Sequence, residues 1–437
     1  MGADGGAAAP GLSGRSLVLL LAATQFLAFS DRFLITLVAQ PLKLDLALSD
    51  TQLGVLQGSA FAVLNAAAMP WAGICADRGH RRSLLLASVL VWGLATLACG
   101  LAGSFAALAV ARALLGLGQA AIAPAALSLM AYRLPPAGIG RAISLFTAGA
   151  TLGRSLALLG GGAALAWLTA AGGLTVPGYG PVRPWQALFA LACLPNLALL
   201  VGLQRVVEPP TAPARTGRPA LAWVLRHRSA YLPHFGAAAA AVLISQTLTA
   251  WAPTFYVRAH GLTPATGGLY LGMVILVAAP LGHIAGGRWL DRARARGLRG
   301  AASRALALGL ALACPSAGVM ALASDLTTSL TGFAVLVAAL GVTSPPALAG
   351  LQILTPRALR GRMSAVFVAS VTLVAFGVGP ALVGVINDRV VGPENVGAAM
   401  FAVFSATALV GIVLALSTRT LRSPRSAARA SAESAPP

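Results

Sequence analysis

The chain has 437 residues, of which 57% are hydrophobic and only 10% are charged, and its mean hydropathy is +0.82. Globular proteins carry about 25% charged residues, so this composition excludes most soluble enzymes. The net charge of +20 would suit a nucleic-acid-binding protein, but the basic residues lie in short clusters between long apolar runs. We therefore expect no nucleic-acid partner.

The apolar runs predict twelve membrane-spanning helices, since one span needs ~20 apolar residues. In the first half of the chain, the predicted spans are 16–40, 52–75, 83–103, 105–131, 142–169 and 185–205. In the second half they are 231–257, 264–289, 302–323, 328–353, 363–387 and 397–418. Leu, Ala, Val and Gly dominate these runs, which favours helices over barrel strands with their alternating pattern. The expected fold class is an all-α membrane protein.

The longest polar stretch between spans divides them six plus six. We expect an N-terminal six-helix bundle at 15–205, a cytoplasmic linker at 206–230 and a C-terminal six-helix bundle at 231–418. Residues 1–14, rich in glycine and alanine, are expected to form a disordered cytoplasmic tail, and residues 419–437 a second cytoplasmic tail.

The distribution of basic residues predicts the orientation, because cytoplasmic loops carry an excess of Lys and Arg. With the N-terminus inside, 23 of the 31 basic residues fall in cytoplasmic segments, and four lie within spans. Only four fall outside: Lys43, Arg183, Arg258 and Arg389. The sequence therefore predicts a multi-pass protein of the plasma (inner) membrane with both termini cytoplasmic.

Two short patterns repeat between the halves. Gly73-x-x-x-Asp77-Arg78 follows the second predicted span, and the same pattern, at 287–292, follows the eighth span 214 residues later. Gly-Arg pairs open the fifth and eleventh spans, at 140–141 and 361–362. Repeats of the same topology imply a pseudo-two-fold axis along the membrane normal, with a substrate site between the halves. The sequence therefore predicts two pseudo-symmetric bundles.

Three glycine-containing motifs resemble those of the Major Facilitator Superfamily. The run 73–82, Gly-Ile-Cys-Ala-Asp-Arg-Gly-His-Arg-Arg, is similar to the family's loop between helices two and three, although the family usually has glycine in place of His80. Arg112-x-x-x-Gly116-x-Gly118 resembles its fourth-helix motif, and Gly149-x-x-x-Gly153 its fifth-helix motif. The resemblance implies a secondary transporter that works by alternating access.

Within that superfamily, the chain resembles bacterial Spinster-like transporters. The similarity lies in Asp31-Arg32, the segments 48–54 and 76–82, the run 116–120 and the stretch 260–272. The anion:cation symporter branch also has Asp-Arg in helix one and stays open as an alternative. The Spinster resemblance implies transport of lysophospholipids, sphingolipids or other amphiphiles, while small organic acids and drugs also stay open.

Asp31 is the only acidic residue near the middle of a predicted span. Charges inside a membrane are costly and are functional candidates by default, so we expect Asp31 to exchange a proton; the alternative is a permanent ion pair with an arginine. Asp31 and Arg32 lie ~100° apart around a helix and need not be partners. Spinster-like proteins usually have a glutamate, implicated in proton coupling, at the position of Gln119. Glutamine cannot titrate, so any coupling here rests on Asp31.

Four arginines lie within predicted spans, and three of them, Arg32, Arg112 and Arg154, are candidates for the substrate cavity. Against one carboxylate they make the expected cavity positive. Because arginine binds carboxylates and phosphates through two parallel hydrogen bonds, these residues predict an anionic or amphiphilic substrate. The alternative for Arg154 is that it bonds backbone carbonyls and anchors a helix.

Further polar residues within the spans complete the predicted substrate site. Gln119 shares a helix face with Arg112 and Gly116, where the glycine leaves room for a substrate or for a neighbouring helix. Asn65 and Tyr256 are predicted substrate contacts, with helix–helix hydrogen bonding as the alternative.

The repeated loop motifs predict a conformational gate. Asp77 can interact with the N-terminal end of another helix or pair with an arginine such as Arg362, holding the outward-open state and separating on inward opening. The basic residues also act as topology signals and contacts to lipid phosphates. The predicted gating residues are Gly73, Asp77, Arg78, Arg81, Arg82, Asp291, Arg292 and Arg362.

Other function classes lack their motifs. Lys43 is the only lysine, so a G-x-x-x-x-G-K-[ST] nucleotide-binding loop is impossible, and the five histidines are scattered without a metal or catalytic spacing. We expect no enzyme activity, no metal and no cofactor. The leading hypothesis is a monomeric secondary transporter of an anionic small molecule or lipid, proton-coupled through Asp31 and in contact with membrane lipids. Drug efflux, organic-anion:proton symport and ligand sensing without transport are the alternatives.

Overall fold

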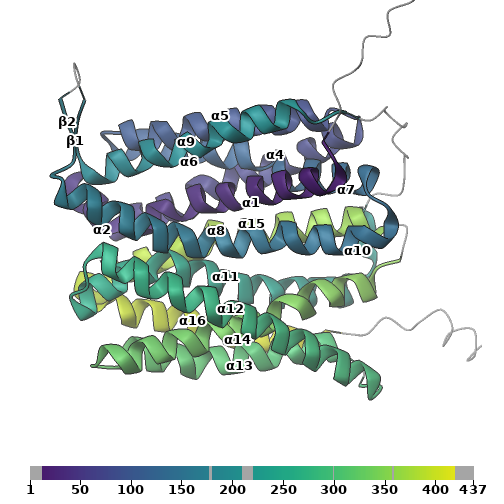
Figure 1. Ribbon diagram of the computed structural model, residues 1–437. Helices are drawn as coiled ribbons and strands as arrows, with labels where there is room; N and C mark the ends of the chain where they lie inside the picture. Colours follow the sequence, from purple (N-terminus) through teal and green to yellow (C-terminus); the bar gives the residue numbers. More distant parts are fainter. Residues whose placement is uncertain (1–11, 177–179, 209–219, 299, 357–358, 419–437) are drawn as a thin grey trace, which may run out of the picture.

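The computed structural model describes residues 12–176, 180–208, 220–298, 300–356 and 359–418. The predicted C-terminal tail, residues 1–11 of the predicted N-terminal tail and residues 209–219 of the predicted linker lie outside them. The described chain is built of long helices and one two-stranded antiparallel hairpin (Figure 1).

The helices and strands occupy most of both halves. In the first half they are α1 (Gly14–Leu37), α2 (Ala39–Asp45), α3 (Asp50–Gln57), α4 (Ser59–Asp77), α5 (Arg81–Leu101), α6 (Phe105–Gln119), α7 (Ile122–Arg133), α8 (Pro136–Ala170), β1 (Leu174–Val176), β2 (Gly180–Val182) and α9 (Pro184–Gln204). In the second half they are α10 (Ala220–Arg226), α11 (Arg228–His260), α12 (Pro264–Ala295), α13 (Ala301–Leu322), α14 (Leu326–Leu354), α15 (Arg360–Ile386), a π-helical turn (Asn387–Val391), a 3₁₀ turn (Pro393–Asn395) and α16 (Val396–Ser417).

Twelve helices in the described ranges are long and apolar enough to cross a membrane, which confirms the predicted spans to within six residues at every end. Large apolar side chains such as Leu322, Val413 and Leu416 are exposed on the outside of the bundle. In a membrane protein these side chains face lipid, so their exposure follows from the apolar composition.

Two spans of the first half are each interrupted by a turn. The second span turns at Gly58, between α3 and α4, and the fourth turns at Ala120 and Ala121, between α6 and α7. Pro124 accounts for the second break, because it has no N–H to donate to the Ala120 carbonyl. Broken helices expose backbone carbonyls inside the membrane, and these need partners.

The spans run between two ends of the molecule. We call the end with the segments that follow α2, α5, α8, α11, α13 and α15 the hairpin end, and the end with those that follow α4, α7, α9, α12 and α14 the linker end. In Figure 1 the β1–β2 hairpin lies at the left and α10 at the right. Helices α1 to α9 form one bundle and α11 to α16 the other, which confirms the predicted architecture; the exact domain limits stay predictions.

The two bundles touch in the half of the molecule nearer the hairpin end. The backbone of Gly54 on α3 lies against Pro380 on α15 so closely that any side chain would collide with it. On the other side, Gly272 on α12 contacts Ser155 on α8. Further toward the linker end, α15 lines a cavity instead of packing on the first bundle.

Candidate functional site

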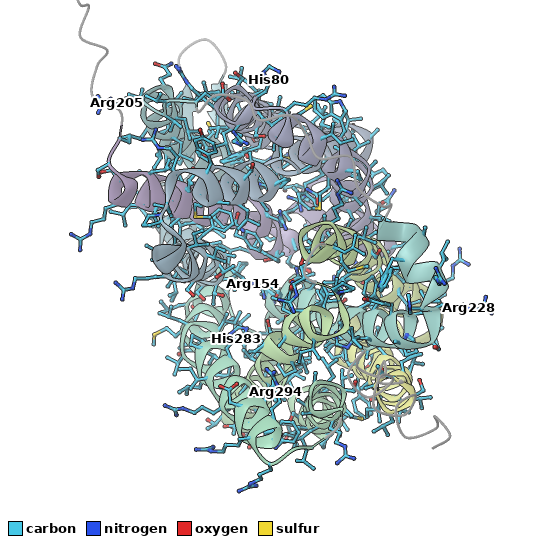
Figure 2. The ribbon with its side chains drawn as sticks, turned by 90° about the vertical axis from the view of Figure 1, so that its right-hand side faces the viewer. His80, Arg154, Arg205, Arg228, His283 and Arg294 are labelled. Carbon is cyan, nitrogen blue, oxygen red and sulfur yellow. The ribbon has the colours of Figure 1, made fainter. Side chains whose placement is uncertain are left out.

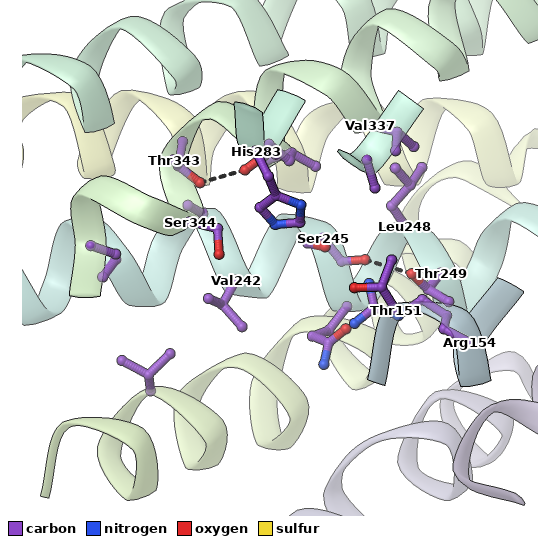
Figure 3. A pocket seen from close by; sticks show the side chains of 18 of the residues that line it. Thr151, Arg154, Val242, Ser245, Leu248, Thr249, His283, Val337, Thr343 and Ser344 are labelled. Atoms are coloured by element: carbon purple, nitrogen blue, oxygen red, sulfur yellow. Dashed lines mark hydrogen bonds between the residues drawn. The ribbon is translucent and has the colours of Figure 1, made fainter. Parts of the chain in front are cut away.

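A cavity of about 340 Å³ lies between α8 of the first bundle and α11, α12, α14 and α15 of the second (Figure 3). Its polar lining consists of Thr151, Arg154, Ser245, Gln246, Thr249, His283, Thr343, Ser344 and Thr372. Its apolar lining includes Ile275, Phe333, Val337, Leu340, Phe367 and Val371. The cavity therefore combines a polar, positively charged part with an apolar wall.

Arg154 supplies the permanent positive charge of this cavity. Its guanidinium lies over the ring of Phe33, with 4.9 Å between the central carbon and the ring centroid. Its buried Nε atom has no hydrogen-bond partner in the described structure. An arginine that lines a cavity and makes no described hydrogen bond suits an anionic ligand, and this geometry does not support the alternative in which Arg154 anchors a helix through backbone carbonyls.

Arg32 lies nearby, at the boundary between the bundles. Its Nε and one terminal nitrogen donate to the side-chain oxygen of Gln119, at 3.0 and 2.9 Å. Its guanidinium lies 4.3 Å from the ring centroid of Phe61 and 5.5 Å from that of Phe376 on the opposite bundle. Because the Gln119 oxygen carries no formal charge, Arg32 keeps a positive charge that no described carboxylate within 4.0 Å balances.

Arg112 is buried and bonds to the backbone. Its Nε donates to the carbonyl of Leu56 at 3.0 Å, and a terminal nitrogen donates to the carbonyl of Arg32 at 3.2 Å. Leu56 lies in the last turn of α3, where carbonyls lack partners within the helix. Arg112 thus holds the break in the second span together and does not line the cavity; its predicted contact with substrate stays a prediction.

Asp31 faces the interior of the first bundle, away from the cavity. Its Oδ2 atom accepts hydrogen bonds from Trp92 (3.1 Å), Thr96 (3.3 Å) and Asn196 (3.0 Å), on α5 and α9. No basic nitrogen of the described residues lies within 4.0 Å of its carboxylate. The alternative of a permanent ion pair with an arginine is therefore wrong, and Asp31 is a buried carboxyl group held by neutral donors.

The other predicted contacts serve packing in this structure. Asn65 donates to the carbonyl of Gly116 at 2.9 Å, joining α4 to α6. Gly116 leaves room for that neighbouring helix, because an added Cβ would collide with the carbonyl of Phe61. Tyr256 is fully buried, and its hydroxyl accepts from Ser329 at 3.1 Å. Neither Asn65 nor Tyr256 lines the cavity, so their substrate roles stay predictions without geometric support.

The predicted gating residues lie at the linker end. Arg81 donates to the hydroxyl of Ser128 at 2.8 Å and lies 5.6 Å from the Tyr132 ring, so these contacts stay within the first bundle. The backbone N–H of Arg82 donates to Glu208 at 2.6 Å.

The remaining gating residues are more exposed. Arg78, Asp291, Arg292 and Arg362 are exposed, and no described atom lies within 4 Å of where a side chain would begin at Gly73. The side chain of Asp77 lies outside the described part of the structure. The predicted contact between Asp77 and Arg362 therefore stays a prediction.

A charged cluster that the sequence did not predict joins the bundles at the hairpin end. The fully buried carboxylate of Asp50 accepts two hydrogen bonds from Arg258 of the second bundle, at 2.9 and 2.7 Å, and one from Lys43 at 2.5 Å. The side chain of Asn387 also donates to Asp50. We call Lys43, Asp50, Thr51, Arg258, Asn387 and Asp388 the hairpin-end cluster.

Asp388 completes the cluster from the second bundle. Its carboxylate accepts from the backbone N–H groups of Asp50 (3.1 Å) and Thr51 (2.7 Å) and from the Thr51 hydroxyl (2.6 Å). A carboxylate is stabilised at a helix N-terminus, here that of α3. The only signals in the sequence were the segment 48–54 and the isolated basic residues of the outer loops.

Comparison with known proteins identifies the family to which this chain is similar. The sequence model of the Major Facilitator Superfamily matches residues 21–380. An MFS-type efflux pump of Mycolicibacterium smegmatis is 28% identical over 90% of each chain. A probable sulfoacetate transporter, SauU, of Cupriavidus necator is 34% identical over 30% of each chain. A 3-(3-hydroxy-phenyl)propionate transporter of Escherichia coli is 38% identical over 22% of this chain and 25% of its own.

Solved structures share the fold. A bacterial homologue of the human lysosomal transporter Spinster, in an inward-facing and unoccupied conformation, superposes with a TM-score of 0.76 at 22% identity, over 93% of this chain and 94% of that one. A D-xylose-proton symporter gives a TM-score of 0.73 at 17% identity, over 92% and 96%. The fold expected from the Spinster-like motifs is thus confirmed. Twelve spans in two bundles, a cavity between them and a family match over most of its length show that this chain belongs to the Major Facilitator Superfamily.

Proposed function

We propose that the protein is a secondary active transporter that carries an anionic, amphiphilic small molecule between the two bundles by alternating access. The observation that carries this proposal is the cavity itself, in which Arg154 supplies a positive charge and none of the described lining residues is acidic. Two of the relatives bear the names of organic-acid transporters, which supports an anionic substrate.

The lining suggests how such a substrate binds. The acidic head contacts Arg154 and the surrounding hydroxyl groups, because arginine pairs well with carboxylates and phosphates. The apolar part lies against Phe333, Val337 and Leu340. A volume of about 340 Å³ is at the lower end of the ~300–1,000 Å³ of typical ligand pockets, so an arylalkanoate-sized acid fits better than an entire two-chain lipid.

We further infer that the structure represents an inward-facing state. The bundles touch near the hairpin end, where the hairpin-end cluster joins them. The excess of arginines in the linker-end segments supports a cytoplasmic location for that end and for both termini. The cavity lies on the linker-end side of the contacts between the bundles, which is where an inward-facing site is reached.

Proton coupling through Asp31 belongs to the same proposal. A buried carboxyl group held by neutral donors, without a basic partner, can be neutral or charged as the first bundle moves. A change in the distances to Trp92 or Asn196 between conformations would change its proton affinity.

The experiment is exchange of labelled probes across proteoliposomes, with 3-(3-hydroxyphenyl)propionate as a small acid and lysophosphatidylglycerol as an anionic lipid. We expect saturable exchange of the small acid, weakened about tenfold or more in Arg154→Ala, which removes charge-assisted hydrogen bonds. Arg154→Lys should lie between the two. Arg288→Ala, an exposed arginine of α12 outside the cavity, is the matched control. Saturable binding without exchange would contradict transport and favour a sensor.

Efflux of drugs is the second candidate function, because the efflux pump from Mycolicibacterium smegmatis is similar along most of the chain. Cationic puromycin serves as the contrasting probe in the same vesicles. Exchange of puromycin without exchange of either anion would favour this second candidate and overturn the proposed anion selectivity.

A further inference from the structure

The cavity brings together two basic side chains from opposite bundles. Arg154 comes from α8 and His283 from α12, and both line the same space. Seen from the linker end, they lie at the boundary between the bundles (Figure 2). The close-up shows the imidazole of His283 pointing into the cavity, toward the side where Thr151 and Arg154 lie (Figure 3).

His283 is the one imidazole among the described lining residues, and acidic groups do not surround it. The polar lining residues of α11 are Ser245, Gln246 and Thr249, and those of α14 are Thr343 and Ser344; none of these ionises. On α12 itself, Arg288 is exposed outside the cavity.

Arg154 is the main charged group acting on the His283 imidazole, because the charged groups of the remaining neighbouring helices are bonded to other residues or exposed. On α1, Arg32 bonds to Gln119, and Asp31 is turned toward α5 and α9. On α13, Arg304 is exposed. A neutral imidazole has one ring nitrogen without a proton, and this nitrogen can take one up.

Elementary electrostatics links the binding of an anion in the cavity to the binding of a proton by His283. In the empty cavity, the positive charge of Arg154 disfavours a second positive charge on His283. An anion that binds between them favours the protonated imidazole, because an opposite charge within a few ångströms stabilises the charged form. Linkage is reciprocal, so a proton on His283 must strengthen anion binding by the same factor.

We propose that His283 is the residue through which this cavity binds a proton together with its anionic substrate. This inference rests on the proposed function and extends it to the direction of coupling. A site at which proton and anion favour each other suits symport, in which both cross together. Antiport of a drug against protons needs the opposite relationship, in which a bound proton weakens binding of the drug.

His283 and Asp31 have different places in this scheme. Asp31 contacts Trp92, Thr96 and Asn196 inside the first bundle and does not reach the cavity lining. It can respond to a change of conformation but makes no direct contact with a ligand at Arg154. His283 lies beside the ligand itself, so its proton is taken up at the moment of binding.

The test is calorimetric titration of 3-(3-hydroxyphenyl)propionate into the purified full-length protein at about pH 7, in two buffers that differ in ionisation enthalpy. The difference between the two apparent enthalpies measures proton uptake. We expect wild type to take up between about 0.3 and 1 proton per bound anion, and its affinity to rise about tenfold from pH 8 to pH 6. His283→Gln should bind with little proton uptake and little pH dependence.

The matched control is His227→Gln, which alters a histidine between α10 and α11 outside the cavity and should keep the wild-type proton uptake. Wild-type binding without proton uptake at any pH from about 6 to 8 would overturn the inference, whatever the variants do. Unchanged proton uptake in His283→Gln would also overturn it and leave anion transport intact. Failure of wild type to bind any anion would overturn the proposed function as well.

If His283→Gln does not fold, the inference is tested with His283→Asn in proteoliposomes. Anion exchange at equal pH on both sides should persist, while accumulation driven by a pH gradient should be lost. Accumulation at the wild-type level in a variant that exchanges the anion would overturn the inference.

Discussion

Arginines inside the membrane of this protein differ in what their guanidinium groups contact. Arg112 donates to two backbone carbonyls, Arg32 donates to an uncharged side-chain amide, and Arg154 lines the cavity with a buried Nε that has no described hydrogen-bond partner. A guanidinium whose donors are occupied by the backbone stabilises structure, and one with a free donor can hold a ligand. Residue type alone does not distinguish these roles.

This difference gives a prediction for Arg112→Ala. Removing the side chain leaves the carbonyls of Leu56 and Arg32 buried without their partners, which costs about 2–4 kcal/mol. We expect the melting temperature in detergent to fall by several degrees, while the folded fraction binds 3-(3-hydroxyphenyl)propionate within about threefold of wild type. An unchanged melting temperature with anion binding weakened tenfold or more would show that Arg112 contacts the substrate instead.

Asp31→Asn tests the buried carboxyl group. The variant is nearly isosteric but cannot exchange a proton, so we expect accumulation of the anion driven by a pH gradient to fall at least tenfold. Exchange of the anion at equal pH should fall much less, because it needs no net proton movement. Gradient-driven accumulation equal to that of wild type would remove Asp31 from the coupling mechanism.

Among the structural elements, the hairpin end of α3 has the densest polar contacts between the bundles. Asp50 pairs with Arg258 of the second bundle, and Asp388 of that bundle accepts from the first N–H groups of α3. These contacts exist only when the hairpin ends of the bundles are together. They are therefore expected to stabilise this conformation relative to one that opens there.

The matching prediction concerns Asp50→Asn. Loss of one partner from a buried ion pair costs about 3–5 kcal/mol, so the balance should shift toward separation of the hairpin ends. Spin labels on Gly103→Cys and Ser324→Cys, both exposed at that end, in a cysteine-free background measure the distance. Asp45→Asn, from the more exposed pair with Arg183 within the first bundle, is the control. An unchanged distance distribution in Asp50→Asn would contradict the role of the cluster.

The elements themselves follow well from the sequence, and their contacts follow less well. Runs of apolar residues bounded by polar ones predict all twelve spans, because a bilayer sets their length. The break at Gly58 and the pairing of Asp50 with Arg258 escaped prediction. The first depends on packing against α15, and the second joins residues 208 positions apart with no local pattern.

The residues of the candidate site also follow only in part from the sequence. The sequence identified Arg32, Gln119 and Arg154 as intramembrane polar residues, and these do lie near the boundary between bundles. Most of the cavity lining comes from α11, α12, α14 and α15. These helices are apolar nearly all round, so periodicity does not reveal which face meets the cavity. His283 therefore did not stand out from other isolated polar residues.

For the whole molecule, orientation in the membrane is a separate prediction. If the linker end is cytoplasmic, a cysteine at Gly103 should react with an impermeant maleimide in intact cells, and one at Arg205 should react only after lysis. Both replacements are made in the cysteine-free background. Reaction at Arg205 in intact cells, with protection at Gly103, would reverse the assigned orientation and make the structure outward-facing.

The central claim is that an organic anion binds between the bundles at Arg154. Its most direct test is the position of bound 3-(4-bromophenyl)propionate in a crystal of the full-length protein, with bromine located by anomalous scattering. The account predicts the carboxylate within hydrogen-bond distance of the Arg154 guanidinium, about 2.7–3.2 Å, and bromine against the apolar wall at Phe333 and Val337. A carboxylate bound beside Asp31, at the hairpin end or on the lipid-facing surface would contradict it.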